Sequence, residues 1–337
     1  AVAAPLLLAV TLLVLMEGGR STATWGRPAR IAARLLMLAC LVAGYLLSGP
    51  IAFASLLVAQ FAALILLPDC FPLRKEGQRD LLGLSLSLGG IIFVLLGLAY
   101  GFVFSYAYTA AFLRDTGLFI FLVAGILAGL PSVRRSSLPD QPTPLLDSSW
   151  AGAFAVSLII LVTFIVWPRA LRPPAEGGQL RAATYNVHYG YDSAWHLSLE
   201  AQAETIEASG ADVVALQEVD TGRPTSYMID DALWLGQRLG MDSVYLPTVE
   251  HLTGIALLSR YPILDAQTLL LPSHLEQTGV IWAALDTGGT PLNAFAIWLG
   301  LTPAERERQL DATLPFLASH PGPAAFGGDF NATPETP

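Results

Sequence analysis

The sequence is poor in cysteine and in charged residues. Only Cys40 and Cys70 occur among 337 residues, both in or beside apolar runs. They give neither a disulfide framework nor the spacing of a metal site. Charged residues make up 13% of the chain, against about a quarter in an average soluble protein. An ordinary soluble composition along the whole chain is therefore excluded. The net charge of −9 also lacks the basic excess that is typical of general nucleic-acid-binding proteins.

Apolar residues are concentrated in the first half of the chain. They make up 53% of the sequence, and the mean hydropathy is +0.55. A helix needs about 20 residues to cross a bilayer. We therefore predict a multi-pass transmembrane region over residues 1–168, with about six helices and the first of them truncated where the sequence starts. The apolar runs are 3–16, 31–48, 51–67, 81–104, 112–130 and 151–167.

Basic residues between these runs predict the orientation of the chain. Loops on the cytoplasmic side of a membrane are enriched in Lys and Arg. One predicted face carries Arg20, Arg27, Arg30, Arg34, Arg74, Lys75, Arg79, Arg134 and Arg135, and the other carries Arg114, Arg169 and Arg172. The richer face is assigned to the cytoplasm, so we expect a cell-membrane protein whose C-terminal domain is extracytoplasmic.

A Pro- and Gly-rich linker, 169–179, leads into a domain of ordinary globular composition, 180–337. Thr302, Pro303 and Glu305 form the N-terminal signal of a helix over 302–320, with Glu305 as a capping-box acid. Mixed strands and helices favour a layered α/β sandwich. The expected strands are 180–187, 212–216, 242–246, 253–259, 263–271, 279–286, 291–298 and 323–327, and the other expected helices are 196–209 and 229–239.

Three of the expected strands end in polar side chains: Asn186, Glu218, and Asp329 with Asn331. Side chains beyond strand ends often meet at one edge of an α/β sheet. One carboxylate among oxygen-rich neighbours suits Mg²⁺, which binds few protein ligands and keeps several waters. A second carboxylate can orient or deprotonate water, and amides can donate to phosphate. The structural alternatives are an Asx turn at Asp329 and a solvated side chain at Glu218.

Four segments in this order resemble the endonuclease/exonuclease/phosphatase superfamily, and the resemblance covers about 180–337. It implies a four-layer α/β/β/α sandwich, incomplete at its C-terminus in this sequence, that cleaves a phosphoester bond with Mg²⁺ or Mn²⁺. Several spans followed by such a domain are similar in architecture to proteins that remodel the lipid of GPI anchors, and to bacterial membrane-bound relatives. The segments are Thr184–Val187, Leu216–Val219, Gly254–Ile263 and Gly328–Pro334.

The resemblance also implies a role for each polar strand end. Glu218 is then the metal ligand, Asn186 supports the metal and the phosphate, Asp329 aligns or activates the attacking water, and Asn331 contacts the phosphate. We also consider His188 and His251 as substrate-binding residues, with a surface or structural role as the alternative for each.

The sequence departs from the family pattern at Trp298, where members carry a histidine. The late Asp-His pair of the family is missing from this sequence, and we expect truncation at Pro337 to be the reason. We expect a membrane-anchored, Mg²⁺-dependent phosphodiesterase acting on a lipid or small molecule. One alternative is a catalytically degenerate module in which Trp298 belongs to a lipid- or partner-binding surface. Another is a membrane-tethered nuclease, although the net charge disfavours nucleic acid as a partner.

Overall fold

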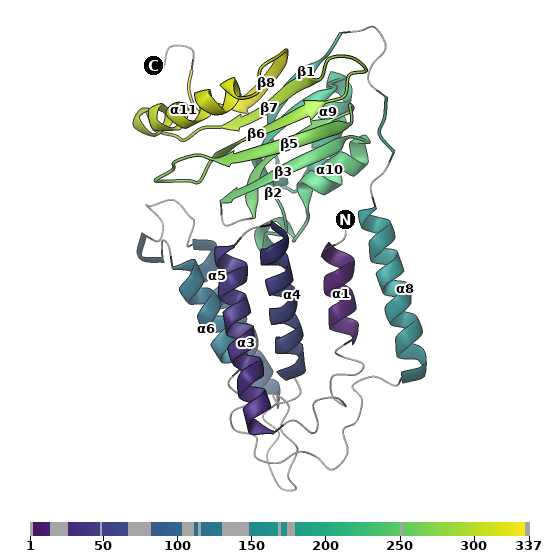
Figure 1. Ribbon diagram of the computed structural model, residues 1–337, viewed down its shortest axis with the longest axis vertical. Helices are drawn as coiled ribbons and strands as arrows, with labels where there is room; N and C mark the ends of the chain where they lie inside the picture. The colour runs from purple at the N-terminus through teal and green to yellow at the C-terminus, as the bar shows by residue number, and fades with distance from the viewer. Residues whose placement is uncertain are drawn as a thin grey trace. The chain divides into compact units, whose positions relative to one another are not determined.

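The computed structural model separates the chain into two compact units, each described by itself below (Figure 1). One unit comprises Ala1–Val103 and Leu113–Trp167, and the other comprises Phe104–Phe112 and Pro168–Pro337. The structure describes residues 3–13, 26–47, 49–66, 82–102, 111–113, 116–129, 148–167, 170–173, 179–249 and 252–333.

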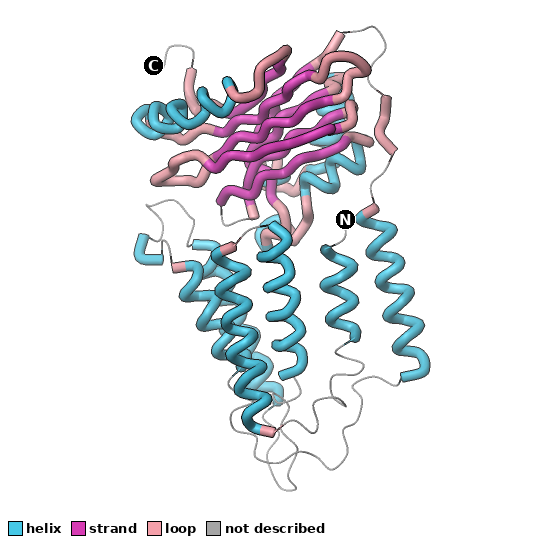
Figure 2. Tube along the Cα trace, viewed as in Figure 1, coloured by secondary structure: helices cyan, strands magenta, loops and turns pink. Residues whose placement is uncertain are grey.

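The first unit is helical, and every predicted apolar run forms a helix in its described part (Figure 2). Three helices are long and apolar enough to cross a membrane: Arg27–Leu46, Gly49–Leu66 and Gly83–Tyr100. Shorter apolar stretches cover Gly117–Gly129 and Phe154–Ile165. The elements are α1 (Ala3–Leu13), α3 (Arg27–Leu46), α4 (Gly49–Leu66), α5 (Leu82–Phe102), η3 (Ala111–Leu113), α6 (Gly117–Gly129) and α8 (Ser148–Val166).

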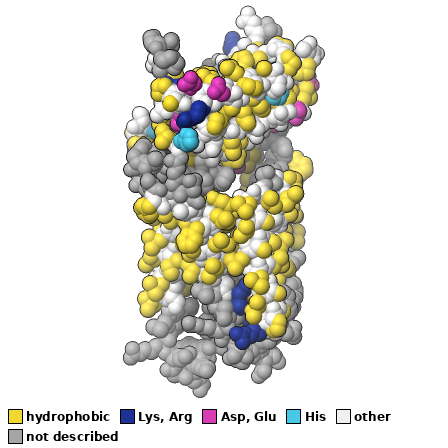
Figure 3. Space-filling model, turned by 60° about the vertical axis from the view of Figure 1, so that its left-hand side comes forward, with side chains coloured by type: hydrophobic (Ala, Val, Ile, Leu, Met, Phe, Trp, Pro, Cys, Tyr) yellow, Lys and Arg dark blue, Asp and Glu magenta, His cyan; other side chains and the backbone are white. Residues whose placement is uncertain are grey.

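The outer surface of these helices is largely hydrophobic (Figure 3). Leu35, Phe93 and Phe164 each expose more than half of their surface. A polar side chain inside the unit is satisfied: the Gln60 amide donates to the Thr11 hydroxyl at 2.6 Å and joins α4 to α1. An unpaired amide would be costly in an apolar environment. Exposed apolar faces and satisfied internal polar groups are what a lipid surrounding requires.

The second unit contains two four-stranded sheets, with strand orders β1-β2-β4-β3 and β5-β6-β7-β8. β1 pairs with β2 in parallel, as does β7 with β8, and the remaining neighbours are antiparallel. The elements are β1 (Ala182–Asn186), η4 (His188–Gly190), α9 (Leu199–Ser209), β2 (Val213–Asp220), η5 (Pro224–Ser226), α10 (Asp231–Leu239), β3 (Asp242–Val249), β4 (Thr253–Ser259), β5 (Ile263–Leu270), β6 (Gly279–Leu285), β7 (Leu292–Trp298), α11 (Pro303–Ala318) and β8 (Ala324–Asp329).

The sheets pack face to face, and helices cover both outer faces (Figure 1). The core between the sheets includes Leu257 of β4 and Ile281 of β6. Leu235 of α10 packs in the core on the outer face of the first sheet, and Phe316 of α11 packs against that of the second. The four-layer α/β/β/α sandwich is confirmed.

At the N-terminus of α11, Thr302 caps the helix as predicted, but Glu305 does not form the predicted capping box. The Thr302 hydroxyl accepts the backbone N–H of Glu305 at 3.3 Å, so Thr302 is the N-cap. Glu305 does not complete a capping box. Its Oε1 accepts the backbone N–H groups of His274 at 2.8 Å and Leu275 at 3.2 Å. Glu305 is 1% exposed, so it fastens the segment between β5 and β6 to the helix.

Candidate functional site

Two of the predicted site residues meet across the two sheets. Asn186 ends β1 in the first sheet, and Asp329 ends β8 in the second. The Asn186 Nδ2 donates to Asp329 Oδ2 at 3.1 Å. Because β1 runs parallel to β2, the Glu218 end of β2 lies at the same edge as Asn186. This edge is the candidate site.

Two glycines before Asp329 allow β8 to come this close. A Cβ on Gly327 would lie 2.8 Å from the Ala215 Cβ in the opposite sheet. A Cβ on Gly328 would lie 2.5 Å from the carbonyl oxygen of Ile297 on the adjacent strand. Both distances are shorter than real Cβ contacts, so any side chain would push β8 outward. The glycine pair therefore sets the position of Asp329.

Asp329 and Asn331 form a tight turn that is tied to the end of β7. Asp329 Oδ1 accepts the backbone N–H of Asn331 at 3.0 Å, so the Asx turn does form. The Asn331 Nδ2 donates to the Leu299 carbonyl at 2.7 Å. The Asp329 carboxylate thus receives one N–H on each oxygen, one from its own turn and one from Asn186. These bonds fix the orientation of the carboxylate.

A buried polar face of α11 supports this turn. This face was not predicted from the sequence. Arg306 is 5% exposed, and its Nη1 donates to the carbonyls of Leu301 and Asn331, at 2.8 Å each. The Gln309 Oε1 accepts the Gly300 N–H at 2.7 Å. Positions 305, 309 and 313 are four residues apart and share one helix face, so polar residues at this spacing were a usable signal.

Glu218 lies at a β-bulge, where the β2–β4 register shifts between Gln217 and Val219. Its φ is +55°, which is costly for a side chain with no special preference for the left-handed region. Bulges re-aim side chains and are frequent beside active sites. The neighbouring Gln217 is 1% exposed, and its Nε2 has no hydrogen-bond partner among the residues that the structure describes.

Of the two candidate substrate-binding histidines, only His188 lies in the described part of the chain. The His188 N–H donates to Asn186 Oδ1 at 2.9 Å, and its ring centroid lies 4.6 Å from that of Trp195. His188 therefore links the candidate site to an aromatic cluster. His251 lies outside the described residues.

Trp298 is buried, which corrects the suggestion that it belongs to a binding surface. It is 1% exposed and packs in the core between the sheets with Leu246 and Ile281. It is the register neighbour of Asp329 in the parallel pair β7–β8. The position expected for a histidine thus carries an apolar side chain next to the carboxylate.

The oxygen donors at this edge suit a hard divalent cation. Glu218 and Asp329 carry carboxylates, and Asn186 carries an amide oxygen. Within the described ranges there is no group of three or more His, Cys, Asp or Glu that would enclose a metal. Mg²⁺ needs no such cage, because it binds through one or two carboxylates and completes its shell with water and substrate phosphate. The donor set therefore fits Mg²⁺ chemically.

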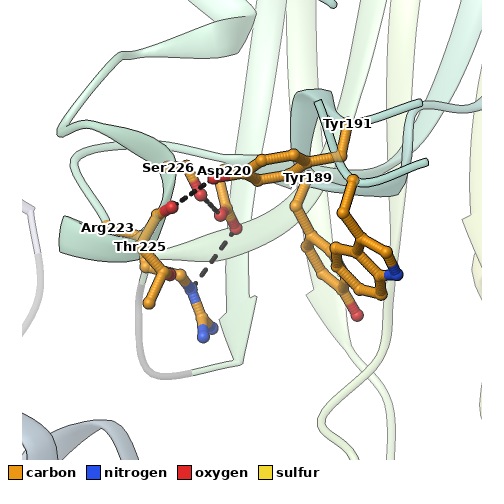
Figure 4. A pocket seen from close by; sticks show the side chains of 7 residues that line it. Tyr189, Tyr191, Asp220, Arg223, Thr225 and Ser226 are labelled. Carbon is orange, nitrogen blue, oxygen red and sulfur yellow. Dashed lines mark hydrogen bonds and ion pairs between the residues drawn. The ribbon is translucent and has the colours of Figure 1, made fainter. Parts of the chain in front are cut away.

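A pocket of about 250 Å³ opens beside this edge (Figure 4). Asp220 lies in its wall and is fully buried. Its oxygens accept the hydroxyls of Ser226 and Thr253, and Arg223 Nε lies 3.4 Å from Oδ1. Burial raises the pKa of Asp220, while these hydroxyls and Arg223 oppose the increase.

Comparison with known proteins places the second unit in a class of phosphoester-cleaving folds. Residues 183–337 match the model of the Endonuclease/Exonuclease/phosphatase family. This part of the chain matches a domain of that family, and it follows the unit of apolar helices in the sequence. The matched segment begins inside β1 and includes every polar strand end described above.

A curated relative shares this domain. Protein cwh43 of Schizosaccharomyces pombe is 30% identical over 151 residues, which cover 44% of this chain. The match spans only 16% of that relative's length.

Solved structures with similarity include three proteins. An endonuclease/exonuclease/phosphatase from Beutenbergia cavernae is 21% identical, with a TM-score of 0.37, over 47% of this chain and 50% of that one. A family protein from Leptotrichia buccalis is 17% identical, with a TM-score of 0.39, over 46% and 69%. The human Nocturnin catalytic domain is 20% identical, with a TM-score of 0.35, over 47% and 65%.

Proposed function

We propose that this protein is a membrane-anchored, Mg²⁺-dependent phosphodiesterase that hydrolyses a lipid or small-molecule phosphodiester. The observation that carries the proposal is the hydrogen bond between Asn186 and Asp329, at 3.1 Å. It joins the polar ends of two strands from different sheets at one edge, beside the strand that carries Glu218. Family membership of residues 183–337 supports the same reaction class.

Each side chain has a distinct proposed role. Glu218 holds the metal, and the Asn186 amide oxygen supports it. When bound, Mg²⁺ supplies Lewis acidity and neutralises charge that develops on the phosphate. Asp329, with both oxygens held by N–H donors, orients the attacking water and accepts its proton. Asn331 donates to the phosphate through the amide hydrogen that is not used by the Leu299 carbonyl. Mn²⁺ also prefers oxygen ligands and is the expected substitute.

A lipid or small phosphodiester is favoured over nucleic acid for two reasons. The chain carries helices that suit a membrane span, which holds the domain near lipid. Its net charge of −9 opposes the approach of a polyanion.

We propose the cell membrane as the location, with the C-terminal domain outside the cytoplasm. The excess of Lys and Arg on one predicted face supports this orientation. Reporter fusions at residue 180 test it: a reporter active only outside the cytoplasm is expected, and one active only in the cytoplasm reverses the topology.

A catalytically inactive binding domain is the second candidate, and Trp298 favours it. An indole cannot shuttle a proton or carry the positive charge of a protonated histidine. Trp298 is buried and pairs in register with Asp329, so an apolar ring occupies the position expected for the histidine.

Hydrolysis by the full-length protein in detergent separates the two candidates. We expect Mg²⁺-dependent cleavage of a phosphodiester that is abolished by chelator. Asp329→Asn should reduce kcat by a factor of about 10²–10⁴, the usual contribution of one acid–base group. Glu218→Gln removes the proposed metal-binding carboxylate and should also lower kcat. Glu307→Gln, an exposed change of the same chemistry on α11, is the control. Wild-type activity no higher than that of Glu218→Gln would favour the inactive binding domain.

A further inference from the structure

Two loops beside the candidate site expose large apolar side chains. Trp195, in the segment after β1, is 64% exposed. Tyr227 and Met228, in the segment after β2, are 70% and 65% exposed. These three residues form the apolar patch, and none of them takes part in the proposed hydrolysis. Single exposed apolar residues are ordinary on a protein surface, but a group of them marks an interaction site.

The two loops are joined, so the three side chains belong to one surface. The Tyr191 hydroxyl donates to the Thr225 carbonyl and ties the first loop to the second (Figure 4). The centroid of the Tyr191 ring lies 5.9 Å from that of Trp195. Burial raises the pKa of Tyr191, and the nearby Tyr227 hydroxyl adds to the increase. Tyr191 therefore has Trp195 of one loop and Tyr227 of the other as neighbours.

The backbone of the apolar patch is strained. Trp195, Tyr227 and Met228 have φ values of +61°, +58° and +58°. Bulky side chains rarely adopt this region, and glycine would form the same turns without strain. Contact of the side chains with water is a second cost. Folding of the sandwich requires neither cost, and strained residues of this kind concentrate where a protein binds or reacts.

The residue types and the surrounding charge indicate what covers the apolar patch. Trp and Tyr are enriched where protein meets the headgroup region of a bilayer, because each combines an apolar ring with a polar group. The patch is flanked by acids, since Asp192 precedes Trp195 by three residues and Asp230 follows Met228 by two. Acidic side chains are repelled by anionic lipid. A neutral, zwitterionic lipid surface is therefore the favoured partner.

The length of the chain between the two units brings such a surface within reach. The Gly240 carbonyl, at the end of α10, accepts the Arg172 N–H at 2.7 Å. From there the nine residues of α10 lead back to Asp231 at the second loop, a rise of about 14 Å. Residues 168–172, which follow the last residue of the first unit, Trp167, span at most about 18 Å. A chain that leaves a bilayer at Trp167 thus permits the loops to meet that bilayer.

We propose that these two loops rest on a zwitterionic bilayer, with Trp195, Tyr227 and Met228 inserted at the level of the lipid headgroups. The His188 ring lies 4.6 Å from that of Trp195, and the His188 N–H donates to Asn186. The apolar patch therefore borders the candidate site, and a lipid phosphate reaches this edge without leaving the bilayer. The inference rests on the membrane anchoring in the proposed function, and not on the hydrolysis.

A fluorescent probe on the first loop tests the contact. The full-length protein, with Cys40→Ser and Cys70→Ser, is placed in phosphatidylcholine nanodiscs, and the probe is attached at Ala194→Cys, an exposed position beside Trp195. Phosphatidylcholine with a spin label near the top of its acyl chain should quench about half of the emission or more. Gly289→Cys carries the control probe on the β6–β7 loop, which lies at the opposite end of the sheets from Asp329, and should keep its emission.

Substitution of the apolar patch tests which residues hold the loop on lipid. Asn adopts a positive φ at low cost, so Trp195→Asn, Tyr227→Asn and Met228→Asn combined should leave the melting temperature unchanged and abolish quenching at Ala194→Cys. Trp195→Phe alone, which keeps an aromatic ring, should retain most of the quenching. Because apolar burial is not screened by ions, raised salt should leave the quenching unchanged, and its loss in salt would contradict the proposed contact.

A third probe separates this surface from the membrane anchoring itself. Phe93 on α5 is 73% exposed, and a probe at Phe93→Cys should be quenched by lipid labelled deeper in its acyl chain. Quenching there without quenching at Ala194→Cys refutes only the contact of the loops with lipid. No quenching at either position refutes the anchoring as well. An Ala194→Cys probe that is shielded from water but not quenched by lipid shows that protein covers the patch, which also overturns the inference, as does equal quenching at Gly289→Cys.

Discussion

Asp231 is a buried acid whose ionisation should control the stability of the second unit. It is the first residue of α10 and is fully buried. Neither carboxylate oxygen has a hydrogen-bond partner of normal geometry in the described part of the chain. Burial raises the pKa of Asp231 to about 8, and the nearby charge of Asp220 adds to the increase. At neutral pH the side chain is therefore mostly protonated.

The difference between the folded and unfolded pKa of Asp231 sets the sign and the size of its contribution to the free energy of unfolding. The ordinary pKa of the group is 3.8 and the folded value is about 8. At about 1.4 kcal/mol per pH unit, this corresponds to roughly 6 kcal/mol. Because the folded pKa is the higher one, the stabilising contribution is complete below pH 3.8 and is lost progressively as pH rises to about 8. Above that pH the folded state must carry a buried negative charge.

Asp231→Asn replaces the acid by a neutral side chain of the same shape, so it should remove this pH dependence. We expect little change in unfolding free energy at pH 4 and a gain of several kcal/mol at pH 8, within the bound of about 6 kcal/mol. Guanidinium unfolding of the full-length protein in detergent, followed by tryptophan fluorescence at both pH values, measures it.

Asp311→Asn, an exposed acid on α11, is the control and should stay within about 0.5 kcal/mol at both pH values. If Asp231→Asn loses as much stability as wild type between pH 4 and pH 8, the pH dependence does not come from a raised pKa of Asp231.

Three further substitutions test how the site is built. Gly327→Ala places a Cβ 2.8 Å from that of Ala215; we expect a loss of about 1–3 kcal/mol in denaturant unfolding, and an unchanged midpoint would contradict the close approach of the sheets. Thr302→Ala removes the N-cap of α11 and should cost about 1 kcal/mol, which an equal melting temperature would disprove. Trp298→His replaces a side chain that is 1% exposed and should cost about 3 kcal/mol or more; retention of full stability would show that the core there is not packed as described.

The sequence predicts those parts of the fold and of the candidate site that depend on local signals. An apolar run followed at once by a polar residue identifies the ends of β1 and β8, and the structure places Asn186 and Asp329 together at these ends. The end of β2 was predicted too early, because this strand continues past Glu218 to Asp220. The described parts of the six apolar runs form helices, as expected for long apolar runs whose backbone polar groups must be satisfied within the segment. The roles of Glu218 and Asn331 stay predictions, since position alone does not establish chemistry.

Features that depend on contacts distant in sequence could not be predicted in this way. Glu305 has a sequence context that favours a capping box, but the N–H groups of His274 and Leu275, thirty-one and thirty residues away, take its carboxylate instead. The pocket is lined by segments distant in sequence, which meet where the Tyr191 hydroxyl donates to the Thr225 carbonyl 34 residues away. Neither pairing leaves a periodic or spacing signal in the chain.

Residues with strained backbone conformations lie near the ends of the three strands that form the candidate site. His188 follows β1, Asn331 follows β8, and Glu218 lies at the bulge two residues before the end of β2. Each has a positive φ, of +49°, +48° and +55° respectively. Asn adopts this region at low cost, but such a conformation costs about 1–2 kcal/mol at an ordinary residue such as Glu. Packing of the sandwich alone does not require this cost, because glycine would end a strand in the same way without strain. Strained residues of this kind concentrate at active sites, and here they lie at the ends that Asn186 and Asp329 bring together. The strain at Glu218 is thus independent support for a functional carboxylate at the end of β2, since it does not depend on the family match.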